Sequence, residues 1–272
     1  MSAASQLSVV NLLPEHYIEH EFFNALVASL DRYIFSGHTL FITHDYTRLP
    51  EYGNHVVVLL TAGDEKGGLP YYHSKVKAVF KHHLDADKVG NVYHLPLPYV
   101  NGFVGVPAIP MRERATDVYF AGRSSRREDM LAAINKLQQR RPDLRITCFV
   151  TGTKFMKGWP IHVYSREMMN SKIVLSPQGA VRPECIRFSE AVKCGCGIIS
   201  CKHPNLSCFR DVPAAYLDSW DTLEQEVDRL LEPEVLEEAH RKTLSAWNRW
   251  FSPQGQAKIM NSAIAATHGD DG

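Results

Sequence analysis

One stretch of the chain, residues 171–200, combines residue types that suit a phosphorylated ligand. An apolar run ending at Ser176 leads into a Pro-Gln-Gly turn that ends at Gly179, and a charged segment follows. The glycine lets backbone N–H groups approach a ligand closely, and the helix expected next presents its positive N-terminal end to an anion. Arg182 and Arg187 add fixed cations that can make bidentate contacts with phosphate. The pattern therefore predicts an anion site.

A carboxylate lies on the same face of that expected helix. Glu190 follows Arg187 by three residues, which brings the two side chains together on the helix surface. A carboxylate there can accept two hydrogen bonds from a diol such as ribose, so the segment suits a sugar attached to a diphosphate. The alternative is a solvated surface ion pair, which contributes little. The Gly/Pro turn before the pair and the apolar strand after it favour the binding interpretation.

A second basic cluster, Arg123-Ser-Ser-Arg-Arg127, follows another apolar run and precedes a helical pattern. The start of a helix, with nearby guanidinium and hydroxyl groups, is a further place where phosphate can bind, through Arg123 and Ser124 in particular. The same residues also suit a helix cap flanked by solvated arginines. The residue types leave both interpretations open.

These motifs need strands and helices to hold them in place. Apolar runs of strand length alternate with helical patterns along the whole chain, which predicts parallel sheets joined by right-handed crossovers. The expected strands cover residues 7–13, 39–43, 55–60, 91–97, 116–121, 145–150, 172–176 and 197–200. The expected helices cover residues 15–35, 72–83, 127–140, 165–170, 187–193, 223–231 and 235–251.

A run of prolines and glycines between residues 96 and 110 divides the chain into two sets of elements. The strand and helix pattern restarts after it, so we expect two Rossmann-like domains, residues 1–105 and 106–272, the second with additional C-terminal helices. Open parallel sheets bind ligands at the carboxyl ends of their strands, so the expected site is a cleft between two such edges. A NAD-linked enzyme is disfavoured, because no G-x-G-x-x-G follows the first strand of either half.

Residues 176–199 resemble a motif of a known family. They are similar to the donor-site signature of exostosin-like glycosyltransferases, in which a strand leads to a Pro-x-Gly loop, an Arg, a Glu three residues later, an Ala, and a Gly before an apolar strand. The matching residues here are Ser176-Pro-Gln178-Gly179, Arg187, Glu190-Ala191, and Gly195 before Gly197-Ile-Ile199. Weaker similarity covers roughly residues 56–231.

The resemblance implies an α/β fold of the GT-B type, with two Rossmann-like domains facing a central cleft, and an inverting glycosyltransferase. The donor would be a nucleoside-diphosphate sugar, often a UDP-sugar, bound as a substrate without a cofactor or a metal. Arg187 would hold the diphosphate and Glu190 the ribose. Glu184, six residues before Glu190, could reach hydroxyls of the transferred sugar, although that spacing departs from the commoner acidic pair of retaining GT-B enzymes. The donor site would also include Ser176, Gln178, Gly179 and Arg182.

An inverting transferase needs a base that takes the proton of the acceptor hydroxyl as its oxygen attacks the anomeric carbon. Residues 59–65 read as a buried strand that runs into a polar turn, which puts Asp64 and Glu65 at its carboxyl end. We favour Asp64, because it directly follows a glycine at which the backbone can turn sharply. His44 and Asp45, at the end of the neighbouring strand, are the rival candidates. Solvated loop residues would give the same pattern.

Composition narrows the possible partners. The 30 basic and 30 acidic residues cancel, so no long-range field would steer the chain to nucleic acid or to an anionic membrane. We expect no membrane-spanning segment and no signal peptide, and hence a cytoplasmic protein. Its partners would be a nucleotide-sugar donor and a glycan or other hydroxyl acceptor. The alternative function is a catalytically silent module that binds a sugar nucleotide or a glycan within a larger complex.

Overall fold

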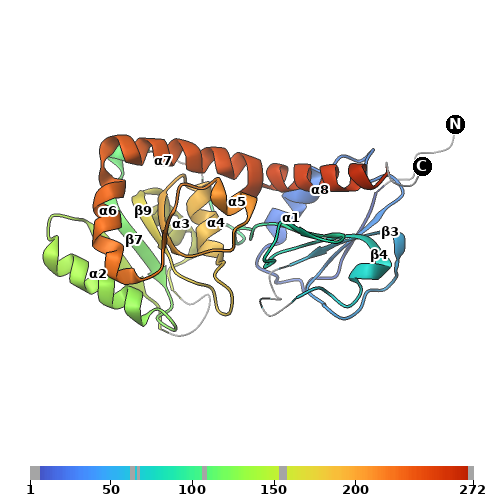
Figure 1. The fold of residues 1–272 in the computed structure, drawn as a ribbon, viewed down its shortest axis with the longest axis horizontal. Coiled ribbons are helices and arrows are strands. Elements are labelled where there is room, and N and C mark those ends of the chain that lie inside the picture. Colours follow the sequence, from blue (N-terminus) through green and yellow to red (C-terminus); the bar gives the residue numbers. More distant parts are fainter. Residues whose placement is uncertain (1–6, 62–64, 66–67, 106–108, 153–157, 269–272) are drawn as a thin grey trace. The chain divides into compact units, whose positions relative to one another are not determined.

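The computed structural model describes residues 7–268 apart from residues 62–64, 66–67, 106–108 and 153–157 (Figure 1). The chain forms two compact units. The first contains residues 1–101, 204–207 and 248–272, and the second contains residues 102–203 and 208–247. The predicted division at residue 105 lies near the first crossing between the units. Residues 248–268, however, which the sequence placed in the second domain, belong to the first unit.

The first unit is built on a six-stranded sheet. Neighbouring strands are parallel except for the last pair, and their order is β1 (Ser8–Asn11), β2 (Thr39–Thr43), β3 (Gly53–Leu60), β4 (Val76–Lys81), β6 (Val92–His94) and β5 (Lys88–Val89). The parallel strands follow one another across the sheet in chain order. This sheet therefore lacks the reversal of strand order that defines a doubly wound fold.

Both faces of the first sheet are buried. Helices α1 (His20–Ala28) and α8 (Pro253–His268) pack against one face, where Phe22 and Met260 share a core cluster with Leu59 of β3. The neighbouring residue, Val58, belongs to a second cluster on the opposite face. Successive side chains of a strand point to opposite faces, so the continuous apolar run of β3 is what a strand buried on both sides requires.

The second unit has a five-stranded parallel sheet with the order β11 (Ala215–Leu217), β10 (Gly197–Cys201), β9 (Ser171–Ser176), β7 (Thr116–Gly122) and β8 (Ile146–Val150). Its longer helices are α2 (Glu128–Arg140), α3 (Ile161–Met169), α4 (Ile186–Lys193), α6 (Leu223–Leu231) and α7 (Pro233–Ala246). A short helix, α5 (Ser207–Arg210), starts at the unit boundary, and a π-helical turn, Trp247–Phe251, follows α7. The core of this unit joins α2 and α6 to the central strands.

The strand order of the second sheet reverses beside β7. The chain passes from β7 to β8 on one side and then crosses to β9 on the other, from which β10 and β11 continue outward. In open parallel sheets a ligand binds outside the carboxyl ends of the strands at such a reversal. The loops that follow β7 and β9 flank this position, so the topology selects residues 123–127 and 177–185 as the walls of a site.

The structure confirms the predicted α/β class, with two units that are each built on a largely parallel sheet flanked by helices. The central cleft between the units stays a prediction. In the part of the chain that the structure describes, no helix is both long and apolar enough to cross a membrane.

Three element predictions were wrong. Residues 72–83 form a short 3-10 turn, His73–Lys75, followed by strand β4 rather than a helix, because the apolar run at residues 76–80 pairs between β3 and β6. The helix expected at residues 15–35 is confined to α1, and that expected at residues 235–251 gives way to the π-helical turn after α7. Helix α8 was not predicted. It packs through the small or flexible side chains of Ala257, Met260 and Ala263, which make a weak apolar stripe.

Candidate anion site at the end of strand β7

The two loops that flank the strand reversal are joined to each other. The guanidinium of Arg126 donates a hydrogen bond to the backbone oxygen of Ala180, which lies in the loop after β9. Arg126 adopts a left-handed backbone conformation with φ of 60°, which is uncommon for a residue with a side chain and is often found at functional sites. The loop after β7 is therefore held in a defined shape by a contact across the reversal point.

Arg187, in the first turn of α4, reaches back to the end of β7. Its Nη2 donates a hydrogen bond of 2.7 Å to the backbone oxygen of Ala121, and its Cζ lies 4.9 Å from the centre of the Phe120 ring. No side chain caps the N-terminus of α4. The positive end of this helix and a fixed guanidinium are thus presented at the same edge of the sheet.

A second arginine occupies the same strand end. Arg127 is 7% exposed, its Nη1 donates a 3.0 Å hydrogen bond to the backbone oxygen of Arg123, and its Cζ lies 5.6 Å from the centre of the Phe120 ring. The Nε atoms of Arg127 and Arg187 are both buried without a hydrogen-bond partner among the described residues. No carboxylate of the described chain forms an ion pair with either guanidinium.

Gly122 makes room for this arginine pair. A Cβ atom at this position would lie 2.3 Å from Nη2 of Arg187 and 3.0 Å from Nη1 of Arg127. Any other residue would therefore displace at least one guanidinium. A glycine is required at the end of this strand because two cationic side chains approach its backbone closely.

Arg127 is buried and Arg187 is half-buried. Burial disfavours the charged form of Arg187, but its pKa is raised by Tyr164, Cys185 and Glu190 nearby. The two like charges repel each other, and a bound anion would relieve that repulsion. Burial, and secondarily the positive charge of Arg187, lower the pKa of Arg127 to about 10. Both side chains are already anchored to backbone oxygens, so an anion would meet guanidinium groups that need little reorganisation. The end of β7 is therefore a candidate site for a group with more than one negative charge.

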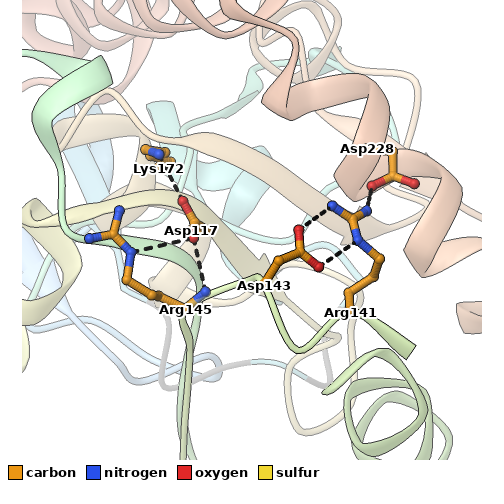
Figure 2. Close-up of polar contacts among 6 residues, drawn as sticks. All are labelled: Asp117, Arg141, Asp143, Arg145, Lys172 and Asp228. Atoms are coloured by element: carbon orange, nitrogen blue, oxygen red, sulfur yellow. Dashed lines mark hydrogen bonds and ion pairs between the residues drawn. The ribbon is translucent and has the colours of Figure 1, made fainter. Parts of the chain in front are cut away.

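The opposite edge of the same sheet shows how charges are paired in this unit (Figure 2). Asp117, near the start of β7, accepts a 2.7 Å hydrogen bond from Nζ of Lys172 and a 2.9 Å bond from the backbone N–H of Arg145. Burial disfavours charge on Asp117, but these contacts hold its pKa below its ordinary value. Arg141 likewise bonds to Asp143 and Asp228. Arg114, at the same edge as Asp117, is fully buried and is satisfied by the backbone oxygens of Ser171 and Cys194 rather than by a carboxylate, so this unit pairs its buried arginines in more than one way.

Glu190 and Arg187 do not form the surface ion pair that their spacing allowed. Glu190 is 3% exposed, and its Oε2 accepts a 2.8 Å hydrogen bond from the hydroxyl of Tyr164 on α3. The Tyr119 hydroxyl in turn donates to the backbone oxygen of Tyr164 at 3.4 Å. Burial raises the pKa of the Tyr164 hydroxyl, which keeps it a donor. The two residues of the predicted motif therefore diverge, Arg187 toward β7 and Glu190 toward α3.

Contacts within the loop after β9 explain why it contains a glycine. The N–H of Gly179 donates to the backbone oxygen of Arg182 at 2.9 Å, and a Cβ at Gly179 would lie 2.4 Å from the backbone oxygen of Glu184. The glycine thus permits the loop to close on itself, in addition to any approach by a ligand. The hydroxyl of Ser176 is buried 3.1 Å from Sγ of Cys185, and Gln178 is exposed.

Three further predicted donor residues have structural partners. Glu184 is 3% exposed and lies near His203. Burial lowers the pKa of His203 to about 4, although the Glu184 carboxylate opposes the shift. Ser124 bonds through its N–H, at 2.8 Å, to the backbone oxygen of Gly152, which ties the loop after β7 to the loop after β8. Arg123 contributes its backbone oxygen to Arg127.

The predicted base residues of the first unit differ in their surroundings. Asp64 lies outside the described residues, and Glu65 is half-buried. His44 is exposed, and its ring stacks on that of Tyr17 at 6.3 Å. Asp45 closes a turn: its Oδ1 accepts 2.8 Å hydrogen bonds from both the N–H and the hydroxyl of Thr47, and these bonds lower the pKa of Asp45.

The expectation of a metal-independent site rested in part on the view that the chain has no Asp-x-Asp metal motif, and the sequence itself corrects that view. Asp85-Ala-Asp87 has the Asp-x-Asp spacing of a metal motif. In the structure Asp87 accepts a 2.9 Å hydrogen bond from the N–H of Ser207 and a 2.7 Å bond from its hydroxyl. Asp87 therefore anchors residues 204–207 to the first unit. Metal independence stays a prediction.

Sequence reasoning missed Tyr164 as the partner of Glu190 and gave Arg127 no separate role in its basic cluster. For Arg127, the sequence did offer a signal, because the residue lies in the loop after a predicted strand that ends at a glycine. Tyr164 carries no such signal, because its contact with α4 depends on the packing of α3.

No family model and no curated protein sequence matches this chain. Among solved structures, the chain is similar to the pneumococcal O-GlcNAc transferase GtfA in complex with UDP and GlcNAc, with 10% identity and a TM-score of 0.45 over 84% of this chain. It is also similar to Anabaena Alr3699/HepE in complex with UDP (10% identity, TM-score 0.43, 97% of this chain and 79% of that one) and with UDP-glucose (11%, 0.43, 86% and 72%). The chain spans 53% of GtfA. At this level of similarity no residue role is transferred.

Proposed function

We propose that this chain is a glycosyltransferase that moves a sugar from a nucleoside-diphosphate donor, with UDP as the expected nucleotide, to the hydroxyl of a glycan or lipid-linked acceptor. The observation that supports the proposal is the pair of guanidinium groups at the end of β7, Arg127 and Arg187, both anchored to backbone oxygens beside the strand reversal. A diphosphate supplies the multiple negative charge that this pair requires. The exostosin-like motif, which contains Arg187, supports the assignment to a sugar nucleotide.

In such a reaction the arginines would act on the leaving group. As the acceptor oxygen attacks the anomeric carbon, the bond from that carbon to the phosphate oxygen breaks and negative charge grows on the diphosphate. Arg127, Arg187 and the uncapped start of α4 would stabilise that charge. Because both guanidinium groups are anchored to backbone oxygens, the stabilisation would be preorganised, which is where electrostatic catalysis is most effective.

The remaining donor contacts are proposed from the motif. Glu190 would bind the ribose, with its orientation set by the hydrogen bond from Tyr164. Glu184 would face hydroxyls of the transferred sugar. We further propose transfer with inversion and without a metal, in the cytoplasm, with the proton acceptor supplied by the first unit. Asp64, Glu65, His44 and Asp45 were the sequence candidates for that acceptor, and the hydrogen bonds from Thr47 that lower the pKa of Asp45 make its carboxylate a weaker base than an ordinary aspartate.

Calorimetric titration with UDP, GDP and NAD tests the donor assignment. Arg187→Ala should weaken UDP binding by about 1.5–3 kcal/mol, or roughly 10- to 150-fold, the scale of a hydrogen bond to a charged group. Arg166→Ala, which removes an exposed arginine of α3 that pairs with Glu167, is the matched control and should leave affinity unchanged. Equal UDP affinity in wild type and Arg187→Ala would reject the site.

The same preparation distinguishes an enzyme from a silent module. Release of UDP from UDP-glucose and UDP-N-acetylglucosamine, with p-nitrophenyl glycosides or water as acceptors, would support a transferase. Donor binding without either transfer or hydrolysis would instead support the sugar-nucleotide-binding module.

A further inference from the structure

Two aromatic side chains form a stacked pair at the end of β8. The ring of Phe149, in the last turn of that strand, lies 4.4 Å from the ring of Trp159, with an angle of 11° between their planes. Gly158 permits this arrangement, because a Cβ there would lie 2.6 Å from Cγ2 of Thr151. The glycine thus lets the chain return against the end of β8 and lay the indole on Phe149. Both aromatic residues are half-buried, so the pair is partly open to solvent.

The aromatic pair lies beside the candidate anion site of the same unit. In the parallel pairing of β7 with β8, Phe149 is opposite Ala121, whose backbone oxygen accepts the hydrogen bond from Arg187. Neighbouring strands lie about 4.8 Å apart, so the backbone of Phe149 is one strand spacing from the residue that anchors the guanidinium. A ribose, which joins the base to the first phosphate of a nucleotide, spans a distance of that order.

Two backbone hydrogen bonds hold the loops after β7 and β8 together. The N–H of Thr151 donates to the oxygen of Gly122 at 2.9 Å, and the N–H of Ser124 donates to the oxygen of Gly152 at 2.8 Å. The loop that carries Arg127 is therefore fixed against the end of the strand that carries Phe149. Such preorganisation lowers the cost of binding one ligand through two of its parts.

The Phe149 ring shares a face of the sheet with the carboxylate proposed for the ribose. Cys148 packs with the core of α2 and α6, and successive side chains of a strand alternate, so Phe149 points to the opposite face. On that face Tyr119 lies 6.1 Å from Tyr164, whose hydroxyl bonds to Glu190. Guanidinium, carboxylate and aromatic groups of one unit thus match the three parts of a nucleoside diphosphate.

We propose that the base of the bound nucleotide stacks on the indole of Trp159. This inference rests on the proposed glycosyltransferase function and assigns the part of the donor that the arginine pair leaves unbound. Phe149 is a positioning residue, because it supports one face of the indole and sets the plane of its ring. Every base has a π face, so the contact favours nucleotides over other diphosphates and does not by itself choose among the bases.

The test compares UDP with inorganic pyrophosphate, which offers two phosphates without a base or a ribose. By calorimetric titration, Trp159→Leu should lower UDP affinity by roughly 5- to 150-fold, the range for a base stacked on an aromatic side chain, and leave pyrophosphate affinity unchanged. Trp159→Phe, which keeps a stacking ring, should fall between wild type and Trp159→Leu. Trp220→Leu, the same change at another half-buried tryptophan of the second unit, is the matched control and should bind both ligands as wild type does.

Tryptophan fluorescence gives a second readout that a merely structural role would not move. UDP should quench the fluorescence of wild type and of Trp220→Leu, because a stacked base contacts the Trp159 indole. In Trp159→Leu that quenching should be absent even at UDP concentrations that saturate the variant.

The outcomes separate this inference from the proposed function. Wild-type UDP affinity in Trp159→Leu would overturn the stacking role while the donor site stands. Equal losses of UDP and pyrophosphate affinity would also overturn it, because they would show that Trp159 only supports the loop. A wild-type chain that binds neither ligand would overturn the proposed function itself. Far-ultraviolet circular dichroism establishes that each variant is folded.

Discussion

Glu19→Gln should make the first unit more stable at neutral pH, whatever the chain catalyses. In the unfolded chain the Glu19 carboxyl ionises near pH 4.5, whereas in the folded chain it is 1% exposed and burial raises its pKa to about 8. Between these values the unfolded state binds fewer protons at this position, so this residue makes folding progressively less favourable as pH rises from about 4.5 to 8. Below pH 4.5 the effect vanishes, and above pH 8 it no longer changes.

The magnitude follows from the shift. The pH of 7 lies about 2.5 units above the unfolded pKa of 4.5 and below the folded pKa of about 8. Each unit corresponds to 1.36 kcal/mol, so the carboxyl destabilises the fold by about 3 kcal/mol at this pH. Glutamine has nearly the same shape and does not titrate. The advantage of Glu19→Gln over wild type should therefore grow from near zero at pH 4.5 to about 3 kcal/mol at pH 7.

Hydrogen exchange of amides in α1 and β2, followed by mass spectrometry, gives a readout confined to the first unit. At pH 7 the variant should show roughly 100-fold greater protection of these amides than wild type, and the two should converge near pH 5 once the intrinsic exchange rate is corrected for pH. Glu21→Gln should follow wild type throughout. Protection that differs by the same factor at every pH would refute the assignment of a raised pKa to Glu19.

Two further predictions concern the arginine pair. Arg127→Met should raise the melting temperature of the ligand-free chain, because it removes a buried charge that lies near the like charge of Arg187. It should also weaken UDP binding at least tenfold by calorimetry. A lower melting temperature would show that Arg127 stabilises the fold. Gly122→Ala should displace the Arg187 guanidinium, because its Cβ would lie 2.3 Å from Nη2, and should cost about 1–3 kcal/mol of stability together with the loss of UDP affinity seen in Arg187→Ala; unchanged UDP affinity would mean that the anion binds elsewhere.

The fold was predictable where the apolar pattern was unambiguous. The run at residues 55–60 is long, β-branched and continuous, and it forms β3 almost as expected. The run at residues 76–80 is equally apolar but follows a helical pattern as well as a strand pattern. Its conformation is decided by pairing with β3 and β6, which sequence periodicity does not report.

The sequence predicted where the candidate site lies in the fold better than it predicted which side chains contact each other there. The Pro-Gln-Gly turn and Arg187 stand at the strand reversal, where a motif for phosphate belongs. The partnership of Glu190 with Tyr164 joins α4 to α3 across 26 residues of chain, and no local pattern encodes it. Glu19 was equally hidden, because in a sequence a buried glutamate looks the same as an exposed one, such as Glu21.

The return of residues 248–268 to the first unit has a consequence for biosynthesis. Ala257, Met260 and Ile264 of α8 belong to the same core as Phe22 and Leu59, so the first unit shares its hydrophobic interior with a segment made after the whole second unit. During translation the second unit can therefore be completed while the core of the first unit still lacks the side chains of α8. The first unit can complete its core only when α8 leaves the ribosome. Until then the sheet face that α8 covers exposes apolar side chains, which a chaperone can recognise.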